Sequence, residues 1–336
     1  MGALPFFWKC TMKQLLSFVI PCYHSAETLP AVVEDIRRTV EADGRYDFEV
    51  ILANDNPPDD TWQVIQQLAA ADRRVKGLCM IRNFGQHAAL MAGYRASKGD
   101  IIISLDDDGQ TPPDQVFKLV DALDGTVDAV YGDYPADHKF ANPFRRFGSN
   151  VNDKMAEWLL KKPKGLYLAS YYAVPRYVMD EVIRYQGPYP YVDGLVLRSA
   201  GRFRNVPVEH KDRAMGQSGY SLKKLMGLWL NGFTSFSVVP LRLATLAGGL
   251  FACAGFVFAL VAILRKLALG AAIDPGWTSI VCLMLIIGGM LMVMVGLAGE
   301  YIGRIYVSMN AAPQYALRQT CNLEEDDAAP EQTSAP

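Results

Sequence analysis

Two long stretches without a charged residue constrain this chain most strongly. Leu243 to Leu264 runs for 22 residues and Trp277 to Gly299 for 23. At about 1.5 Å per helical residue, each can cross a hydrocarbon layer about 30 Å thick. Two buried core helices are the alternative, but soluble helices of this length normally carry a polar stripe. We therefore predict a transmembrane hairpin over 241–304, with spans at about 243–264 and 277–299.

Basic residues flank the outer ends of this hairpin more heavily than its connecting loop. The outer flanks hold Lys211, Arg213, Lys223, Lys224, Arg242, Arg304 and Arg318, while the loop holds Arg265 and Lys266. By the positive-inside rule, both termini and the part of the chain that precedes the hairpin are expected in the cytoplasm. The formal net charge of −2 argues against a general nucleic-acid binder, which needs a broad basic surface.

A basic amphipathic segment at 218–240 precedes the first predicted span. Its apolar residues fall on one helical face, namely Leu222, Leu225, Met226, Trp229, Phe233 and Phe236. Core packing would produce the same stripe. Because the segment leads into a membrane span, we interpret it as an interfacial helix lying on the bilayer.

Residues 15–217 are expected to form one α/β domain, preceded by an extension at 1–14. Short β-rich runs at 15–23, 48–55, 75–82, 101–106 and 128–134 alternate with helical patterns, and further on we predict a helix near 144–160 and a strand near 166–174. This alternation predicts a mostly parallel sheet covered by helices, whose ligands bind beyond the carboxyl ends of the strands. Residues 305–336 are expected to be a cytoplasmic C-terminal segment with a disordered acidic tail.

Three successive aspartates follow the apolar run 101–105, in "SLDDDGQTPP". Side chains alternate along an extended segment, so Asp106 and Asp108 share one side and Asp107 points the other way. Two converging carboxylates, with Gln110 as a third oxygen ligand, suit Mg²⁺ or Mn²⁺. A solvated acidic turn is the alternative. The position after a buried strand and before a helix opened by Pro112 and Pro113 favours the metal site.

Further polar residues follow the other predicted strands. Asp55, in "ANDNPPDD", is expected to accept hydrogen bonds from a nucleoside, whereas Asp59 and Asp60 suit a turn or a helix cap. Other residues expected to bind the donor nucleotide are Pro21, Tyr23, Arg82, Asn83, Gly85 and Asp107. His87 is interpreted as a capping or packing group.

Basic residues lie between the sheet and the first span. Most are expected to be ordinary solvated charges. Arg213 is instead expected to bind the phosphate of a lipid headgroup, because it lies in a glycine-rich turn just before the interfacial helix. A guanidinium group binds phosphate in a bidentate manner. We expect the acceptor phosphate to contact Arg145, Arg146, Arg213 and Ser218.

The motifs "RNFGQHAALMAG", "LDDDGQTPP", "HKDRAMGQSGYS" and "GLAGEYIGRIY" occur in this order. In these segments the chain resembles family 2 glycosyltransferases of the GT-A fold, over about residues 15–316. Within that family it resembles the polyprenyl-phosphate glycosyltransferases, which include the enzymes that load formamido-arabinose onto undecaprenyl phosphate and the dolichol-phosphate mannose synthases. The resemblance implies a bacterial inner-membrane enzyme that forms homo-oligomers.

The resemblance also implies roles for individual residues. Asp106, Asp108 and Gln110 would hold the metal on the donor diphosphate, Asp55 would contact the nucleoside and Arg213 would face phosphate. Three segments depart from the family pattern: the usual DDGS reads "NDNP", the usual Asn-Glu reads His24-Ser25, and "LASYYAVPR" replaces an aspartate-containing segment. These departures surround the nucleoside and sugar, so the sequence leaves the donor open, with a UDP sugar favoured.

These features predict inverting transfer of a sugar from a nucleotide diphosphate to a polyprenyl phosphate. Because a phosphate monoester is already mostly ionised near neutral pH, no strong general base is required. Asp193, in "YVDGL", is expected to position the acceptor or the sugar. One alternative is a processive polysaccharide synthase, although such enzymes typically carry a QxxRW segment, which is lacking here. The other is a non-catalytic nucleotide-sugar-binding membrane protein.

Overall fold

The computed structural model describes residues 13–134, 157, 162–209, 246, 248, 250, 257, 261, 264, 277–309 and 313–323. The chain divides into two compact units. One comprises Met1–Tyr220 together with Pro313–Pro336, and the other is Ser221–Ala312. The candidate site lies in the first unit.

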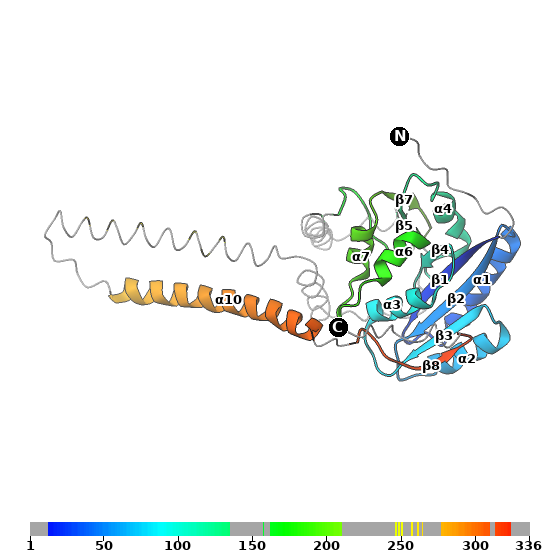
Figure 1. The fold of residues 1–336 in the computed structure, drawn as a ribbon, viewed down its shortest axis with the longest axis horizontal. Helices are drawn as coiled ribbons and strands as arrows, with labels where there is room; N and C mark the ends of the chain where they lie inside the picture. Colours follow the sequence, from blue (N-terminus) through cyan, green and yellow to red (C-terminus); the bar gives the residue numbers. More distant parts are fainter. Residues whose placement is uncertain are drawn as a thin grey trace, which may run out of the picture. The chain divides into compact units, whose positions relative to one another are not determined.

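The first unit is built on a mixed sheet of eight strands (Figure 1). The strands are β1 (Gln14–Cys22), β2 (Tyr46–Asn54), β3 (Val75–Met80), β4 (Ile101–Ser104), β5 (Ala129–Asp133), β6 (Tyr172–Pro175), β7 (Phe203–Pro207) and β8 (Leu317–Cys321). Their order across the sheet is β7-β5-β6-β4-β1-β2-β3-β8.

Most neighbouring strands run parallel, as the sequence predicts. β1 pairs in parallel with β2 and β4, β2 with β3, and β5 with β7. β6 runs antiparallel between β4 and β5, and β8 runs antiparallel along β3. The carboxyl ends of β1, β2, β3 and β4 therefore meet at one edge, where ligands of such sheets bind.

Helices cover both faces of the sheet. They are α1 (Leu29–Asp43), α2 (Thr61–Ala71), α3 (Gln86–Ala96), the short 3-10 helix η1 (Pro113–Gln115), α4 (Val116–Asp121), α6 (Arg176–Ile183) and α7 (Val192–Ser199). Side chains alternate along β1, so Leu16 and Phe18 join the core cluster with α1, whereas Val19 faces α3. Helices α3, α6 and α7 contact one another (Figure 1).

Helix α1 illustrates how sequence pattern becomes packing. Its apolar residues recur every three or four positions in the sequence and are all buried, namely Leu29, Val32, Val33, Ile36 and Val40. Gly44 ends the helix with φ of 71° and donates its N–H to the Val40 carbonyl at 3.0 Å. A left-handed residue at this position suits glycine, because it has no Cβ to clash.

Helix α3 packs closely on the sheet through Gly93. A Cβ at this position would lie 2.4 Å from Val19 Cγ1, which is closer than two carbon atoms approach. The small residues of this helix therefore have a structural reason, since they let α3 lie directly on β1 and β2.

The strand predicted at 166–174 is wrong in extent, because β6 covers only Tyr172–Pro175. The Tyr167 backbone is instead paired with the Asn205 side chain, which accepts its N–H at 2.9 Å and donates to its carbonyl at 2.8 Å. Helices α6 and α7 and strands β7 and β8 were not predicted, since they are only 5 to 8 residues long and short segments give a weak periodic signal.

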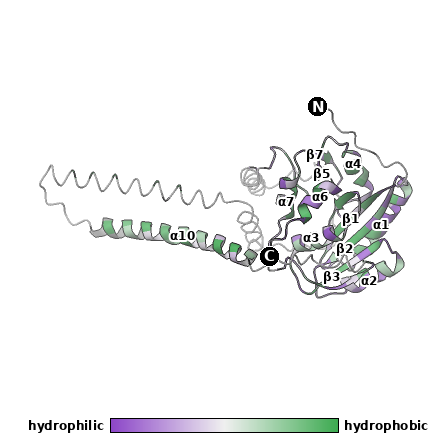
Figure 2. Cartoon of the chain, in the orientation of Figure 1, coloured by the Kyte–Doolittle hydropathy of each residue, from purple (hydrophilic) through white to green (hydrophobic). Residues whose placement is uncertain are grey.

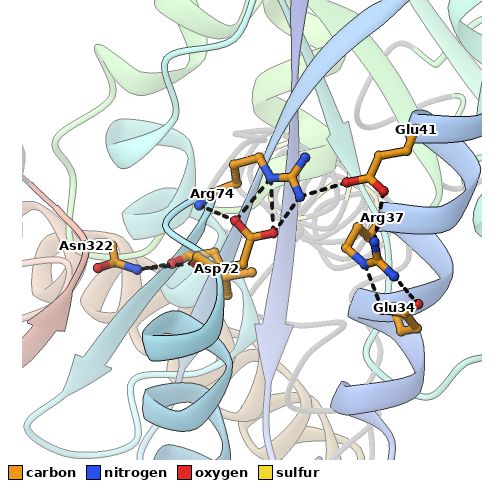
Figure 3. Close-up of polar contacts among 7 residues, drawn as sticks. Glu34, Arg37, Glu41, Asp72, Arg74 and Asn322 are labelled. Carbon is orange, nitrogen blue, oxygen red and sulfur yellow. Dashed lines mark hydrogen bonds and ion pairs between the residues drawn. The ribbon is translucent and has the colours of Figure 1, made fainter. Parts of the chain in front are cut away.

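At the amino ends of the strands, a polar network joins α1, the start of β3 and the residue after β8 (Figure 3). Arg74 bonds Asp72 at 2.7 Å and Glu41 at 2.8 Å, and Glu41 also pairs with Arg37. Asn322 donates its amide N–H groups to the carbonyls of Ala69 and Val75. This network fastens the C-terminal strand at the end of the sheet opposite the strand carboxyl ends.

The second unit contains helix α10 (Trp277–Met309), which is 33 residues long and includes the second predicted span. Its residues are mostly apolar (Figure 2). Measured by length and apolar content together, no helix in the described portion of the chain qualifies as a membrane span. The interfacial helix predicted at 218–240 lies outside the described residues. Of the helix predicted near 144–160 only Glu157 is described, and of the first predicted span only isolated positions are described.

Candidate functional site

The acidic motif lies directly beyond β4, at the carboxyl edge of the sheet. Asp106, Asp107, Asp108 and Gln110 are all half-buried, so none is splayed fully into solvent. Asp108 Oδ1 accepts the N–H of Gln110 at 3.1 Å, which closes a tight turn with Gly109 at φ of 72°. The turn brings two carboxylates and one amide oxygen onto one short segment.

Asp106 is held by two residues from other elements. Ser170, just before β6, donates its hydroxyl to Asp106 Oδ2 at 2.5 Å. Gln86, the first residue of α3, donates its amide to Asp106 Oδ1 at 3.4 Å. Sequence reasoning identified neither contact, because both depend on pairing between distant segments.

Asp107 joins the acidic turn to the loop after β1. Its carboxylate accepts the N–H of Tyr23 at 3.1 Å and the hydroxyl of Ser25. Burial raises the pKa of Asp107, and the hydrogen bonds from Ser25 and Tyr23 oppose that rise. Asp107 thus points away from the side proposed for Asp106 and Asp108. Its contacts connect the loops that follow β1 and β4.

The oxygen donors of the acidic turn fit a hard divalent cation. Carboxylate and amide oxygens are the ligands that Mg²⁺ and Mn²⁺ prefer. In the part of the chain that the structure describes, no three His, Cys, Asp or Glu side chains gather as a metal cluster. Asp106 and Asp108 would therefore need Gln110, water or substrate oxygens to complete an octahedral shell.

Asp55, at the end of β2, anchors the loop after β3. It is only 4% exposed, and its two carboxylate oxygens accept the N–H groups of Phe84 at 2.7 Å and Gly85 at 2.8 Å. Burial raises the pKa of Asp55, while these two hydrogen bonds oppose that rise. Gly85 has φ of 93°, where a side chain would be strained. The carboxylate thus shapes the loop that carries Arg82 and Asn83.

Two loops at this edge hold non-glycine residues with positive φ. His24 has φ of 60° and Asn56 has φ of 50°. His24 Nδ1 lies 3.4 Å from Asp59 Oδ2, and its ring meets that of Tyr23 edge to face. Such conformations are retained where the surroundings impose them, commonly at ligand sites. Pro21 is buried, whereas Tyr23, Arg82 and Asn83 are exposed.

Asp193 and His87 form a second polar cluster, at the adjoining ends of α7 and α3. His87 Nδ1 accepts the N–H of Val192, the first residue of α7, at 3.4 Å. This contact supports the capping interpretation of His87, although the helix that it caps is α7. Burial lowers the pKa of His87 and raises that of Asp193, while the attraction between the two opposes both shifts.

Buried tyrosines connect this cluster with the acidic turn. The hydroxyls of Tyr94 and Tyr172 lie 2.5 Å apart. Burial raises the pKa of Tyr94, and the charges of both Asp193 and Asp106 raise it further. The charges of both carboxylates therefore act on the same buried hydroxyl.

The residues predicted to bind the acceptor phosphate lie outside the described residues. They are Arg145, Arg146, Arg213 and Ser218. Their expected roles stay predictions.

Comparison with known proteins identifies the family. The model of "Glycosyl transferase family 2" matches residues 17–181. The undecaprenyl-phosphate 4-deoxy-4-formamido-L-arabinose transferase of Aeromonas hydrophila is 34% identical over 313 residues, covering 91% of this chain and 94% of that relative. This chain belongs to glycosyltransferase family 2. The enzyme of the same name from Proteus mirabilis is 31% identical, covering 92% of this glycosyltransferase and 95% of that relative.

Among solved structures, this glycosyltransferase is similar to glucosyl-3-phosphoglycerate synthase from Mycobacterium tuberculosis, solved in complex with Mn²⁺ and uridine-diphosphate-glucose. The two are 21% identical, with a TM-score of 0.44, over 63% of this chain and 74% of that chain.

The departures from the family pattern have local structural consequences. Asn54, in "NDNP", is 1% exposed, and its Oδ1 has no hydrogen-bond partner among the residues that the structure describes. A carboxylate there would be more costly, because an unpaired buried charge loses more hydration than an amide. Ser25 is likewise buried and binds Asp107 and, through its N–H, Thr61 Oγ1. The segment "LASYYAVPR", which replaces an aspartate-containing segment of the family pattern, contains Ser170, whose hydroxyl binds Asp106.

Proposed function

We propose that this glycosyltransferase moves a sugar from a nucleotide-diphosphate sugar to the phosphate of a polyprenyl phosphate such as undecaprenyl phosphate. The observation that carries the proposal is the similarity, over more than nine-tenths of the chain, to relatives named undecaprenyl-phosphate 4-deoxy-4-formamido-L-arabinose transferases. The acidic turn at the carboxyl edge of the sheet supports it, because that edge is where α/β sheets bind their ligands.

The donor diphosphate would lie beside the acidic turn. Asp106 and Asp108, with Gln110, would hold Mg²⁺ or Mn²⁺, and the ion would neutralise charge on the departing nucleotide diphosphate. On the nucleotide side we propose the residues at the neighbouring strand ends, namely Pro21, Tyr23, Asp55, Arg82, Asn83, Gly85 and Asp107. Asp55 would act mainly through the loop that it anchors, since both of its oxygens already accept backbone N–H groups.

The acceptor phosphate would act as the nucleophile. Its second pKa is about 6, so it is mostly ionised near neutral pH and needs no strong general base. The difficult step is to bring two anions together, which positive charge at the site makes possible. Arg145, Arg146 and Arg213, with Ser218, would supply that charge and a hydrogen bond. Asp193 would position the acceptor or the sugar for a single inverting displacement.

We also propose that the enzyme is held at the cytoplasmic face of the bacterial inner membrane. The predicted spans at 243–264 and 277–299 and the interfacial helix at 218–240 would place the site beside the lipid acceptor and raise its effective concentration. Support comes from α10, where large apolar side chains are exposed, including Met284 at 70% and Met292 at 78%. We further propose that the donor is a UDP sugar and that the enzyme assembles into a homo-oligomer.

The test uses membranes that contain the full-length protein, undecaprenyl phosphate and a panel of radiolabelled UDP, GDP and dTDP sugars. Label that enters the organic phase only when Mg²⁺ or Mn²⁺ is present supports the proposal. Asp108→Asn should lower that transfer by at least ~100-fold, since a lost metal contact removes several kcal/mol of transition-state stabilisation. Absence of lipid-linked label with every donor would contradict the function, and unchanged transfer by Asp108→Asn would contradict the metal role alone.

A further inference from the structure

Ser170 lies outside the acidic turn and donates its hydroxyl to Asp106 Oδ2 at 2.5 Å. We propose that Ser170 is a positioning residue for Asp106, which it holds in the orientation that binds the divalent cation, with Gln86 restraining the other carboxylate oxygen. The inference rests on the proposed function, because it assumes that Asp106 is a metal ligand.

The antiparallel strand β6 explains how Ser170 reaches Asp106. Ile101 pairs with Pro175 and Ser104 with Tyr172. Continuing that register by two residues beyond the last pair places Ser170 opposite Asp106. A parallel strand in this position would bring a different residue to the acidic turn. The reversal of β6 is therefore the feature of the fold that supplies the hydroxyl.

The backbone on both sides of Ser170 is fixed. Ala169 and Tyr171 are 9% and 0% exposed, and both belong to the main core cluster. Two residues further back, Asn205 holds the Tyr167 backbone through its N–H and its carbonyl. The Ser170 hydroxyl is thus presented from a rigid support, as a precisely oriented ligand shell requires.

The two hydrogen bonds act on opposite oxygens of one carboxylate. Ser170 donates to Oδ2 at 2.5 Å and Gln86 donates to Oδ1 at 3.4 Å. A carboxylate on a loop otherwise rotates about its side-chain bonds, and that freedom must be lost when it binds a metal. A carboxylate oxygen has two lone pairs, so a hydrogen bond to it does not prevent it from also binding a metal ion. Loss of such outer-shell partners typically weakens metal binding 10- to 100-fold.

The experiment measures Mn²⁺ binding to the full-length protein in detergent, by the electron paramagnetic resonance signal of free Mn²⁺ in the presence of UDP. Ser170→Ala should raise the Mn²⁺ dissociation constant at least ~10-fold. Ser170→Thr keeps a hydroxyl and should bind Mn²⁺ much as the wild type does. Excess Mn²⁺ should restore the metal-bound state of Ser170→Ala, which a general structural defect would not allow.

The matched control is Ser97→Ala. Ser97 is buried, whereas Ser170 is half-buried, and like Ser170 it donates its hydroxyl to one oxygen, here the Tyr94 carbonyl at 2.7 Å. Ser97 lies before β4, at the end of that strand opposite the acidic turn. Its loss should leave Mn²⁺ affinity unchanged. If Ser170→Ala does not fold, Ser170→Cys keeps the shape of the side chain, at a somewhat larger volume, while weakening the donor, and it should raise the dissociation constant in the same way.

The outcomes separate this inference from the proposed function. Mn²⁺ affinity that is equal in the wild type, Ser170→Ala and Ser170→Cys would overturn the role of Ser170. Asp106→Asn should abolish the same binding. If Asp106→Asn binds Mn²⁺ normally, the metal site itself is wrong and the assignment of Ser170 is overturned with it.

Discussion

At the scale of single residues, Asp128 is the carboxylate with the most complete set of partners in the described part of the sheet. It accepts hydrogen bonds from the Arg202 guanidinium, from the Tyr177 hydroxyl, and from the N–H groups of Gly201 and Arg202. These contacts lower the pKa of Asp128 from its ordinary value of 3.8 to about 2. Asp128 thereby ties β5 to α6 and to the start of β7.

Asp128→Asn should lower the free energy of unfolding at pH 7 by about 1.5 kcal/mol, a value reduced for the 57% exposure of Arg202. The folded pKa is below the unfolded pKa, so the contribution of the ionised group is fully present above pH 4 and is lost as pH falls from 4 towards 2. Urea unfolding of both proteins at a series of pH values measures it. The difference between them should shrink below pH 4, and a constant difference would contradict this assignment.

The matched control for this prediction is Asp35→Asn. Asp35 lies on α1 and pairs with Arg38, whose side chain is 73% exposed. Exposed pairs contribute little, so the control should change the free energy of unfolding by less than ~0.5 kcal/mol.

Some residues of the candidate site can be located from a local sequence pattern, whereas others depend on contacts between distant segments. Asp106 and Asp108 could be located from the sequence, because three aspartates after a buried strand form a local pattern. Ser170 could not, since its contact with Asp106 spans 64 residues and depends on the antiparallel register of β6. Asp55 could be located at the strand end, but its bonds to Phe84 and Gly85 could not.

At the scale of elements, the segment that follows α10 is attached to the sheet in several places. Gln314 is buried and donates to the carbonyls of Tyr185 and Gly187, while its oxygen accepts from Arg95 at 2.9 Å. Further on, β8 pairs with β3 and Gln319 accepts the indole N–H of Trp62 at 2.7 Å. These contacts make β8 an integral strand of the catalytic sheet.

Gln314→Ala should lower the free energy of unfolding by about 2 kcal/mol, because it leaves two carbonyls and one guanidinium without this buried partner. The substitution should also accelerate amide hydrogen exchange relative to the wild type, and the increase should be larger in β8 than in β1, since the lost contacts lie beside the C-terminal segment. Gln66→Ala, at an exposed position on α2, is the control and should have little effect. Equal exchange rates in β8 of the variant and the wild type would mean that β8 holds without Gln314.

At the scale of the whole molecule, the proposed membrane attachment is tested on α10. Met284→Arg places a charge on an exposed apolar side chain within the predicted span 277–299. It should weaken membrane insertion by about 3 kcal/mol, because arginine at the centre of a spanning helix is unfavourable by that amount. The measurement is the fraction of protein that stays with membranes after extraction at alkaline pH.

The control for this prediction is Met309→Arg. Met309 is 79% exposed and ends α10 beyond the predicted span, where an arginine can reach water. It should be retained like the wild type. Equal retention of the Met284 and Met309 variants would contradict a span at 277–299.

The amino-acid sequence by itself determined the α/β class of the first unit, five of its strands, the apolar face of α1 and the position of the acidic motif. Each of these depends on neighbours within a few residues, through periodicity and turn chemistry. The order of the strands, the reversal of β6, the addition of β8, the meeting of His87 with Val192 and the two restraints on Asp106 were decided only by the tertiary structure. They join segments far apart in the chain, and no local pattern specifies which distant backbone will pair.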